Sequence, residues 1–310
     1  MMLRSVLRSS SHAVMRLAYP ARRAAVPLRQ RRLVTAPAAL PRVFLSLLPS
    51  GPALLPPDEA KHVAKALRMV VGDKLELFDG AGRVVQCQVS IVSQRGGVTV
   101  APLHAPVSFA WEGPAWDVYV GGLAGLPASR SDWLVEKVCE LGARSLTPLL
   151  CDHGSSSSGG AGEAESRARW GRLAVAASKQ SLRLHGLALR PAEPLSRVLL
   201  APEPTDVSPL RPLLVVAAVQ GAPSLRTALR LGTDASSDAI DLTRGGRLII
   251  GPPGGWSDAE VALMSCGGEA GGKRSSSGGA RVVAVGLGPL RLRTETAALS
   301  LLAAVQILAE

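Results

Sequence analysis

The sequence predicts an α/β protein in which a small β-rich domain precedes a larger domain built on a parallel sheet. Strand-like and helix-like segments alternate from residue 116 onward, and the strand-like segments are continuous apolar runs. Such runs are typical of parallel strands that helices cover on both faces. Short strand-like runs separated by glycine-rich turns at 42–108 indicate the β-rich domain. A chain of 310 residues is long enough for both domains.

The small domain is expected over 41–108. Its predicted elements are a strand in RVFLSLL, a helix at 57–69 with apolar residues at helical spacing, and strands in DKLELFDG, RVVQCQVSIV and GVTVAPL. The turns DGAG and QRGG separate the last three segments. The segment HAPVSFAWEGPA then predicts a linker to the larger domain, which is expected over 115–310.

The larger domain is expected to alternate strands and helices up to a closing C-terminal helix. Strands are predicted in WDVYVGGL, SLTPLL, LLVVAAV, RLIIG and RVVAVG; helices are predicted in SDWLVEKVCELG, at 163–181, in SLRTAL, after Ser257 and at the C-terminus. The loops of such a sheet bind ligands at the carboxyl ends of the strands. Two low-complexity segments, near 154–165 and 265–280, are predicted to be surface insertions without a packed role.

The positive charge of the chain is concentrated at its N-terminus. The net charge is +11, but residues 1–57 hold nine arginines and no acidic residue, so 58–310 carry 26 basic against 24 acidic residues, or +2. The charge of the body therefore gives no argument for nucleic-acid binding. Residues 1–40 are rich in Arg, Ser and Ala, which predicts a disordered organelle transit peptide, mitochondrial in preference to chloroplast. The alternative is a basic arm that grips RNA.

The sequence predicts neither a membrane span nor a metal site. No run of about 18 apolar residues occurs, so no transmembrane helix is expected. The four cysteines lack CxxC spacing, which implies neither a disulfide framework nor a zinc site, and the CDH at 151–153 is too short to make one.

Two loops carry the candidate chemistry. In RLIIGPPGGWSDAE an apolar strand runs into a glycine loop, and Ser257 and Glu260 form a predicted capping box for the next helix. Alone, this pattern fits a plain strand–turn–helix as well as a ligand site. In LGPLRLRTETA, Thr294 is the expected N-cap and Glu295 suits the first turn of the closing helix. The start of a helix does not explain the arginines that precede them, Arg291 and Arg293.

Six motifs in order make the sequence similar to a known family. The motifs are PRVFLS, HVAKALRMVVGD (62–73), EKVCELGARSLTPLL (136–150), Trp170 with KQSLR (179–183), the glycine loop and the LGPLRLRTETA loop. Together they resemble the RsmE family of SPOUT-class methyltransferases, which methylate N3 of a uridine in small-subunit ribosomal RNA. The resemblance covers about 41–310 and implies a C-terminal sheet tied in a trefoil knot, an N-terminal PUA-like β-barrel that helps to hold RNA, and a homodimer.

The resemblance also implies the cofactor and the site residues. S-adenosylmethionine is expected against the two loops and a neighbouring strand, at Ala218, Gly251, Pro252, Gly254, Gly255, Leu287, Gly288, Leu290, Leu292, Arg293 and Thr294. Arg293 and Glu295 are the candidate catalytic residues, because the N3 proton of uridine must leave and a carboxylate or an arginine can assist. Arg42, Arg68, Gln180 and Arg183 are the candidate RNA contacts.

The sequence departs from the family pattern at two places. Pro253 stands where the family usually has an acidic residue, and CDHGSSSS stands where it often has an Arg-Ser pair. Despite these departures, the resemblance and the predicted leader imply methylation of N3 of a uridine in the small-subunit (16S-type) ribosomal RNA of an organelle, with an assembled subunit as substrate. The alternative is a weak or inactive relative that binds ribosomal RNA as an assembly factor. A generic nucleotide-binding enzyme would need a phosphate loop that the sequence lacks.

Overall fold

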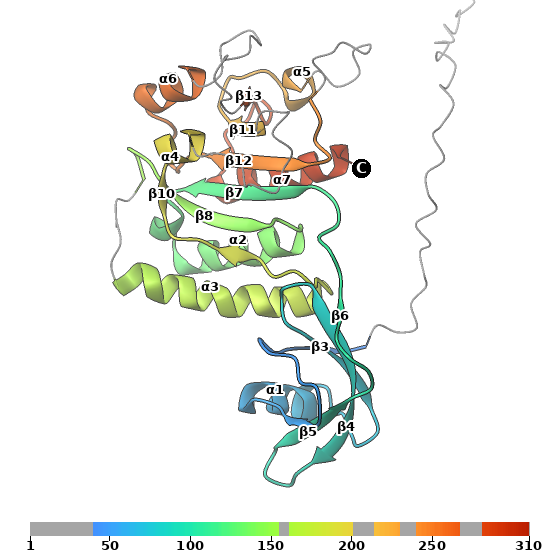
Figure 1. Ribbon diagram of the computed structural model, residues 1–310. Helices are drawn as coiled ribbons and strands as arrows, with labels where there is room; N and C mark the ends of the chain where they lie inside the picture. Colours follow the sequence, from blue (N-terminus) through green and yellow to red (C-terminus); the bar gives the residue numbers. More distant parts are fainter. Residues whose placement is uncertain (1–39, 155–160, 201–213, 230–239, 267–280, 310) are drawn as a thin grey trace, which may run out of the picture. The chain divides into compact units, whose positions relative to one another are not determined.

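The computed structural model describes residues 40–154, 161–200, 214–229, 240–266 and 281–309, and these residues form two sheets (Figure 1). The predicted leader at 1–40 lies outside the described residues except for Leu40. None of the helices in the described ranges is long and apolar enough to cross a bilayer. Nor do these ranges hold a group of three or more His, Cys, Asp or Glu side chains suited to a metal ion.

The first sheet has six strands within the described residues, in the order β1–β3–β4–β5–β2, with β6 pairing with β4. β1 is parallel to β3 and the other pairs are antiparallel. The strands are β1 (Arg42–Phe44), β2 (Ala53–Leu54), β3 (Lys74–Phe78), β4 (Arg83–Val92), β5 (Val98–Pro102) and β6 (Val107–Ser108). Alternate residues of β3 and β4 point into one core, as the sequence pattern predicts.

A short helical segment closes the core of this sheet. It consists of α1 (Pro57–Lys61) and a π-helical turn, η1 (His62–Ala66), whose Ala60 and Val63 are buried in the same core. The helix predicted at 57–69 is therefore correct in place but ends three residues early. It ends there because Arg68 takes a left-handed conformation, with φ of 54°, which a helix cannot continue.

The second sheet has seven strands within the described residues, and all of its pairs are parallel. The order is β10–β8–β7–β12–β11–β13, with β9 pairing with β8. The strands are β7 (Ala115–Gly121), β8 (Ser145–Leu150), β9 (Ala188–Leu189), β10 (Glu193–Pro194), β11 (Leu214–Ala218), β12 (Gly245–Ile250) and β13 (Arg281–Val285). The predicted fold class, with its parallel sheet, is confirmed.

Helices cover both faces of this sheet (Figure 1). One core lies between the sheet and the helices α2 (Ala128–Glu140), α3 (Ala161–Gln180) and α7 (Thr294–Leu308), and β7 contributes Trp116, Val118 and Val120 to it. The second core lies between the sheet and the helices α4 (Leu195–Leu200) and α6 (Asp258–Cys266), and β7 contributes Tyr119 to it. A 3₁₀ turn, η2 (Leu123–Gly125), follows β7, and α5 (Leu225–Ala228) follows β11. The two cores explain why the strands are continuously apolar.

The predicted insertions lie mostly outside the described residues, but their edges are structured. Residues 161–165 belong to the first turns of α3, and the Glu163 carboxylate accepts a hydrogen bond from the Ala192 backbone N–H at 3.2 Å. The prediction that 154–165 has no packed role is therefore wrong for Glu163, whereas the helix predicted at 163–181 is confirmed and begins two residues earlier. The Ala- and Glu-rich composition of 161–165 is that of a helix start.

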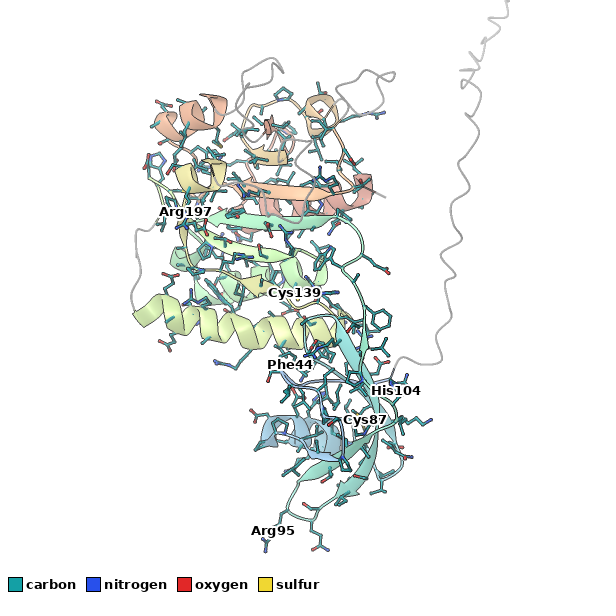
Figure 2. The ribbon with its side chains drawn as sticks, in the orientation of Figure 1. Phe44, Cys87, Arg95, His104, Cys139 and Arg197 are labelled. Atoms are coloured by element: carbon teal, nitrogen blue, oxygen red, sulfur yellow. The ribbon has the colours of Figure 1, made fainter. Side chains whose placement is uncertain are left out.

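Two cysteines fill core positions. Cys87 is fully buried in the first sheet, where burial raises the pKa of its thiol to about 11. Cys139 is fully buried between α2 and α3, with its Sγ 3.3 Å from Ser178 Oγ (Figure 2). Both side chains act as small apolar groups of the interior.

Candidate functional site

The candidate site lies where the parallel strands end. The loops after β11, β12 and β13 leave the sheet at the carboxyl ends of adjacent strands, because these three strands are neighbours in parallel register. Open α/β sheets bind ligands at this edge. The two loops that the sequence singled out are therefore brought to one place.

The glycine loop after β12 is a tight turn. The Gly255 N–H donates to the Pro252 carbonyl at 2.9 Å, and Gly255 takes a φ of 83°, which favours glycine. A Cβ on Gly251 would lie 3.0 Å from the Trp256 ring, so a larger residue there would have to displace the indole. The glycines thus serve both the turn and the close packing of Trp256.

Three hydrogen bonds join the glycine loop to its neighbours. Thr294 Oγ1 donates to the Gly251 carbonyl at 3.2 Å, and the Arg291 guanidinium donates to the Pro253 carbonyl at 3.0 Å. Trp256 Nε1 donates to the carbonyl of Ala218, at the end of β11, at 2.9 Å. These bonds connect three of the predicted cofactor residues, one from each loop: Ala218, Gly251 and Thr294.

Thr294 has a different role from the one we predicted. α7 begins at Thr294, Arg293 is its N-cap, and no side chain caps the helix. The prediction of Thr294 as N-cap is wrong because its hydroxyl donates to Gly251 instead of accepting from the first turn of the helix. Thr294 is the first residue of α7, and its hydroxyl connects the helix to the glycine loop instead of capping the helix.

The loop before α7 presents backbone groups without internal partners. The N–H groups of Gly288, Leu290 and Leu292 have no acceptor in the described part of the chain. Gly288 takes a φ of 107°, and a Cβ built on it would meet no atom within 4 Å. Leu290 is 77% exposed. The loop therefore offers hydrogen-bond donors and apolar surface to a ligand.

Glu295 is held by an arginine that we did not predict. Arg130 of α2 donates Nε and Nη2 to the two carboxylate oxygens at 2.7 and 2.5 Å, and the Glu295 side chain is only 7% exposed. The hydrogen bonds from Arg130 lower the pKa of Glu295, and the charges of Arg130 and Arg293 act in the same direction. A paired carboxylate with a lowered pKa is a poor proton acceptor. This geometry favours bracing of α7 over proton transfer.

We expect Glu295→Gln to lower the melting temperature at pH 7 by roughly 2–4 °C. The folded-state pKa of Glu295 is lowered, so its ionised form stabilises the fold above the unfolded-state pKa of about 4.3. That stabilisation is lost as the pH falls through the folded-state value. Thermal unfolding of wild type and variant from pH 7 to pH 3 should therefore converge at low pH. A constant difference across this range would contradict the role of the charge.

Arg293 differs from the other charged residues of the loop. Its side chain is exposed and has no hydrogen bond or ion pair to any described residue, although it lies near enough to lower the pKa of Glu295. Arg291, by contrast, binds Pro253. Arg293 is therefore the arginine of this loop that is free to reach a ligand.

The loop after β8 also packs against the glycine loop. His153 Nδ1 lies 3.1 Å from the Gly255 carbonyl, and Ser257 Oγ donates to the Asp152 carboxylate at 2.6 Å. The sequence signal for this contact between the two loops is the position of CDH directly after a buried strand.

The predicted capping box at the start of α6 is confirmed. The Ser257 N–H donates to the Glu260 carboxylate at 2.8 Å, and the Glu260 N–H donates to Ser257 Oγ at 3.2 Å.

Cys151, the first residue of this loop, is a partly buried free thiol. Burial and the negative charge of Glu260 raise the pKa of its thiol to about 12. The thiol therefore stays protonated at neutral pH.

Two of the four predicted RNA residues are engaged inside the protein. Arg42 pairs with Glu76 at 2.9 Å and donates to the Leu182 carbonyl. Arg183 donates to three backbone carbonyls, including that of Cys139 at 2.8 Å, and lies 5.4 Å from the Trp111 ring centre. These contacts give both arginines a role in the fold, and their contact with RNA stays a prediction. Sequence alone did not reveal these partners, which lie up to 140 residues away.

The other two predicted RNA residues remain available. Arg68 and Gln180 are both exposed, and within the described ranges neither side chain has a hydrogen-bond partner. The two residues lie on separate elements: Arg68 follows η1, and Gln180 is the last residue of α3.

Comparison with known proteins identifies families for both parts of the chain. Residues 120–306, more than half of the chain, match the family of the RNA methyltransferase domain, and residues 55–103 match the RNA methyltransferase PUA domain. Ribosomal RNA small subunit methyltransferase E of Mycobacterium bovis is 29% identical over 261 residues, which cover 83% of this chain and 86% of the relative. The Bacillus subtilis protein of the same name is 26% identical over 253 residues, or 80% and 87% of the two chains.

Solved structures have the same fold. Ribosomal RNA small subunit methyltransferase E from Neisseria gonorrhoeae, bound to S-adenosyl methionine, aligns with a TM-score of 0.62 and 24% identity over 87% of this chain and 98% of that one. A probable rRNA methyltransferase from Porphyromonas gingivalis aligns with a TM-score of 0.65 and 24% identity over 87% and 100%. Given the family matches and the shared fold, the chain belongs to the RNA methyltransferase family, with a PUA domain before the methyltransferase domain.

Proposed function

We propose that this protein transfers a methyl group from S-adenosylmethionine to N3 of a uridine in small-subunit ribosomal RNA. The observation that carries the proposal is the joined set of loops at the carboxyl ends of β11, β12 and β13, with open backbone donors at Gly288, Leu290 and Leu292. Family membership supports the reaction class, and the names of the relatives support the cofactor and the substrate.

The residues present fit S-adenosylmethionine. An adenosine group needs hydrogen-bond donors and acceptors beside apolar surface, and the loop before α7 supplies N–H donors next to Leu287 and the exposed Leu290. Gly288 and Gly255 leave open space, because a Cβ on either would meet no atom within 4 Å. Pro253 contributes no N–H, but its carbonyl is held by Arg291. When bound, the cofactor supplies a methyl group that its sulfonium activates.

Arg293 is the residue that we assign to the uridine. Loss of the N3 proton leaves negative charge on the uracil ring, and a guanidinium placed beside that ring stabilises it. Arg293 suits this role because its side chain is exposed and has no partner among the described residues. Glu295 supports it indirectly, since its ion pair with Arg130 fixes the start of α7 immediately after Arg293.

Five further parts of the proposal rest on the family resemblance and on the sequence. Arg68 and Gln180 contact the RNA, and the substrate is an assembled small subunit. The protein is a homodimer, for which the exposed Leu290 and Ile307, at 77% and 70%, offer apolar surface. The second sheet carries the trefoil knot. Residues 1–40 direct the protein to the mitochondrion, with the chloroplast as the alternative.

Mapping of modified bases tests the proposal. We expect N3-methyluridine to be present at one position of organellar small-subunit RNA in normal cells and absent in cells that lack the protein. The organelle whose RNA changes also identifies the location. In vitro, purified protein and S-adenosylmethionine should restore the modification on unmethylated subunits far better than on a short oligonucleotide. A protein that binds the subunit but gives no calorimetric signal with S-adenosylmethionine would instead be an assembly factor.

A further inference from the structure

A second surface of the protein has the features of a ligand site. Two cavities of about 560 and 420 Å³ adjoin α3, and both are lined by Phe44, Gly171 and Val175. We name these two cavities the α3 groove. Ligand sites typically have volumes of about 300–1,000 Å³. None of the three residues belongs to the loops at the strand ends, so the groove is distinct from the site described above.

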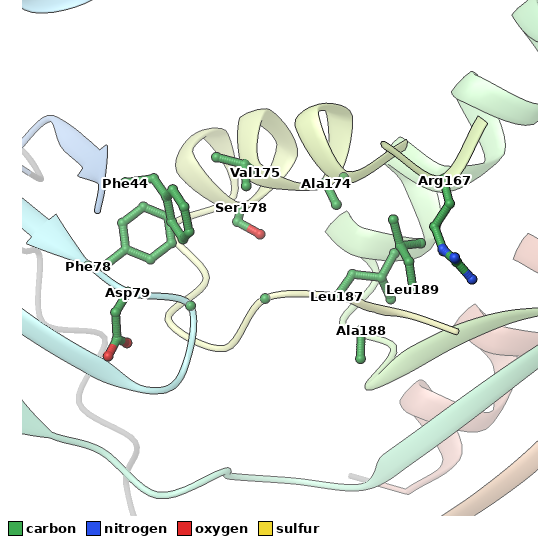
Figure 3. A pocket seen from close by; sticks show the side chains of 13 residues that line it. Phe44, Phe78, Asp79, Arg167, Ala174, Val175, Ser178, Leu187, Ala188 and Leu189 are labelled. Atoms are coloured by element: carbon green, nitrogen blue, oxygen red, sulfur yellow. The ribbon is translucent and has the colours of Figure 1, made fainter. Parts of the chain in front are cut away.

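The wall of the α3 groove is aromatic at one end and basic at the other. Phe44 of β1 packs edge-on against Phe78, with ring centres 5.6 Å apart, and Arg167 stands at the opposite end of the larger cavity (Figure 3). Two of the three phenylalanines of the chain are thus at this one cavity. Phe78 is buried behind Phe44, so the half-buried ring of Phe44 is the aromatic surface that this cavity offers to a ligand.

The acidic residues of the groove are neutralised internally. The Asp79 carboxylate pairs with Arg83 at 2.6 Å and accepts the Ala81 N–H at 2.8 Å, while Glu59 pairs with Lys179. These two carboxylates therefore present little net negative charge to a ligand.

The arginines of the groove are less constrained. Arg172 is exposed and has no hydrogen bond or ion pair to any residue that the structure describes. Among the described residues, Arg167 has only a long ion pair with Glu163, at 3.8 Å, and its side chain is 37% exposed. The charge left over at the groove is positive, which selects an anionic ligand.

We infer that the α3 groove binds an unpaired segment of the substrate RNA, with a base against Phe44 and phosphates at Arg167 and Arg172. Aromatic faces that stack bases, combined with cations that track the backbone, are how proteins hold single-stranded nucleic acid. The identity of the ligand as RNA rests on the proposed function. The groove contacts nucleotides other than the methylated uridine, since it shares no residue with the loops that hold the cofactor.

Gly171 allows a direct test. It lines both cavities, and a Cβ built on it would meet no described atom within 4 Å outside its own helix turn, so a leucine side chain at this position starts in open space at the groove. Glycine in a helix interior is destabilising, so Gly171→Leu should fold at least as well as wild type. The matched control is Gly162→Leu, because Gly162 is an exposed residue of the same helix with equally open surroundings, outside the groove.

Binding to an oligouridine of about 12 nucleotides is measured by fluorescence anisotropy at 0.15 M salt with the full chain. We expect Gly171→Leu to weaken binding by about 10-fold relative to Gly162→Leu, with equal or higher melting temperature. The nine arginines of residues 1–57 act equally in both variants, so the ratio isolates the groove. Phe44→Leu should weaken binding by a similar factor, whereas Phe109→Leu, at the third and exposed phenylalanine, should not.

The outcomes separate this inference from the proposed function. Equal affinity of the two glycine variants, in a protein that still methylates small subunits, would overturn the groove and leave the function intact. A change of molecular mass in Gly171→Leu without a change in RNA affinity would mean that a second copy of the chain occupies the groove, which also overturns the inference. A wild-type protein that neither binds nor methylates RNA would refute the proposed function itself.

Discussion

Replacing Arg293 with alanine is expected to lower the rate of methyl transfer by about 100-fold or more, while the melting temperature changes little. The side chain is exposed and makes no hydrogen bond or ion pair within the described part of the chain, so the fold loses almost nothing. The reaction, in contrast, loses the cation that we place beside the uracil ring as N3 gives up its proton. The loss should fall on kcat under saturating S-adenosylmethionine.

Arg291→Ala is the matched control for this variant. Arg291 lies on the same loop and is also exposed, but it is committed to the Pro253 carbonyl. Its removal should loosen the glycine loop and raise the KM for S-adenosylmethionine more than it lowers kcat. Arg293→Lys should recover part of the activity, because lysine keeps the charge but not the planar guanidinium. Near-normal turnover by Arg293→Ala on small subunits would rule out the assignment.

The sequence was informative about elements that local pattern determines. The continuous apolar runs predicted β7, β8, β11, β12 and β13 of the second sheet, because residues such as Val118 and Tyr119 are each buried on one of its two faces. The strands β9 and β10 were not predicted, because each has only two residues and gives no apolar run. The capping box of Ser257 and Glu260 was predictable because both partners lie within one helical turn. The meeting of the two loops was predictable because parallel strands place their carboxyl ends together.

The sequence was less informative about side-chain partners that are distant in the chain. Arg130 and Glu295 are 165 residues apart, and nothing in either neighbourhood announces the pair. Arg42 and Arg183 were assigned to RNA by their place in motifs, yet their side chains hold backbone carbonyls that only tertiary packing brings within reach. A motif predicts where a functional arginine stands in the sequence, but only the packed structure shows whether its guanidinium faces solvent or contacts the protein.

The same distinction applies to Pro253. As a departure from the family pattern it raised the question of whether the glycine loop can hold a cofactor. In the structure the residue is exposed, and its carbonyl is the acceptor for Arg291. The loop keeps its turn, since the Gly255 N–H still reaches the Pro252 carbonyl. Proline therefore removes a charge and a donor without breaking the connection between the loops. We propose that the loop before α7 makes the main contacts with the cofactor.

That proposal makes Gly288→Ala the sharpest test of the cofactor site, and we expect it to weaken S-adenosylmethionine binding by at least about 10-fold. With a φ of 107°, residue 288 has a conformation that alanine strongly disfavours. The backbone must therefore rotate, and the N–H groups of Leu290 and Leu292 move with it. Isothermal titration calorimetry with S-adenosylmethionine measures the affinity, and thermal unfolding measures the strain.

Gly96→Ala provides the matched control. Gly96 has a φ of 86° in the turn between β4 and β5, and a Cβ there would also meet no atom within 4 Å. Both variants should lose a similar few degrees of melting temperature, because the same kind of strain is introduced. Only Gly288→Ala should lose affinity for the cofactor. If Gly288→Ala binds S-adenosylmethionine as tightly as Gly96→Ala and wild type do, the backbone of the loop before α7 does not hold the cofactor.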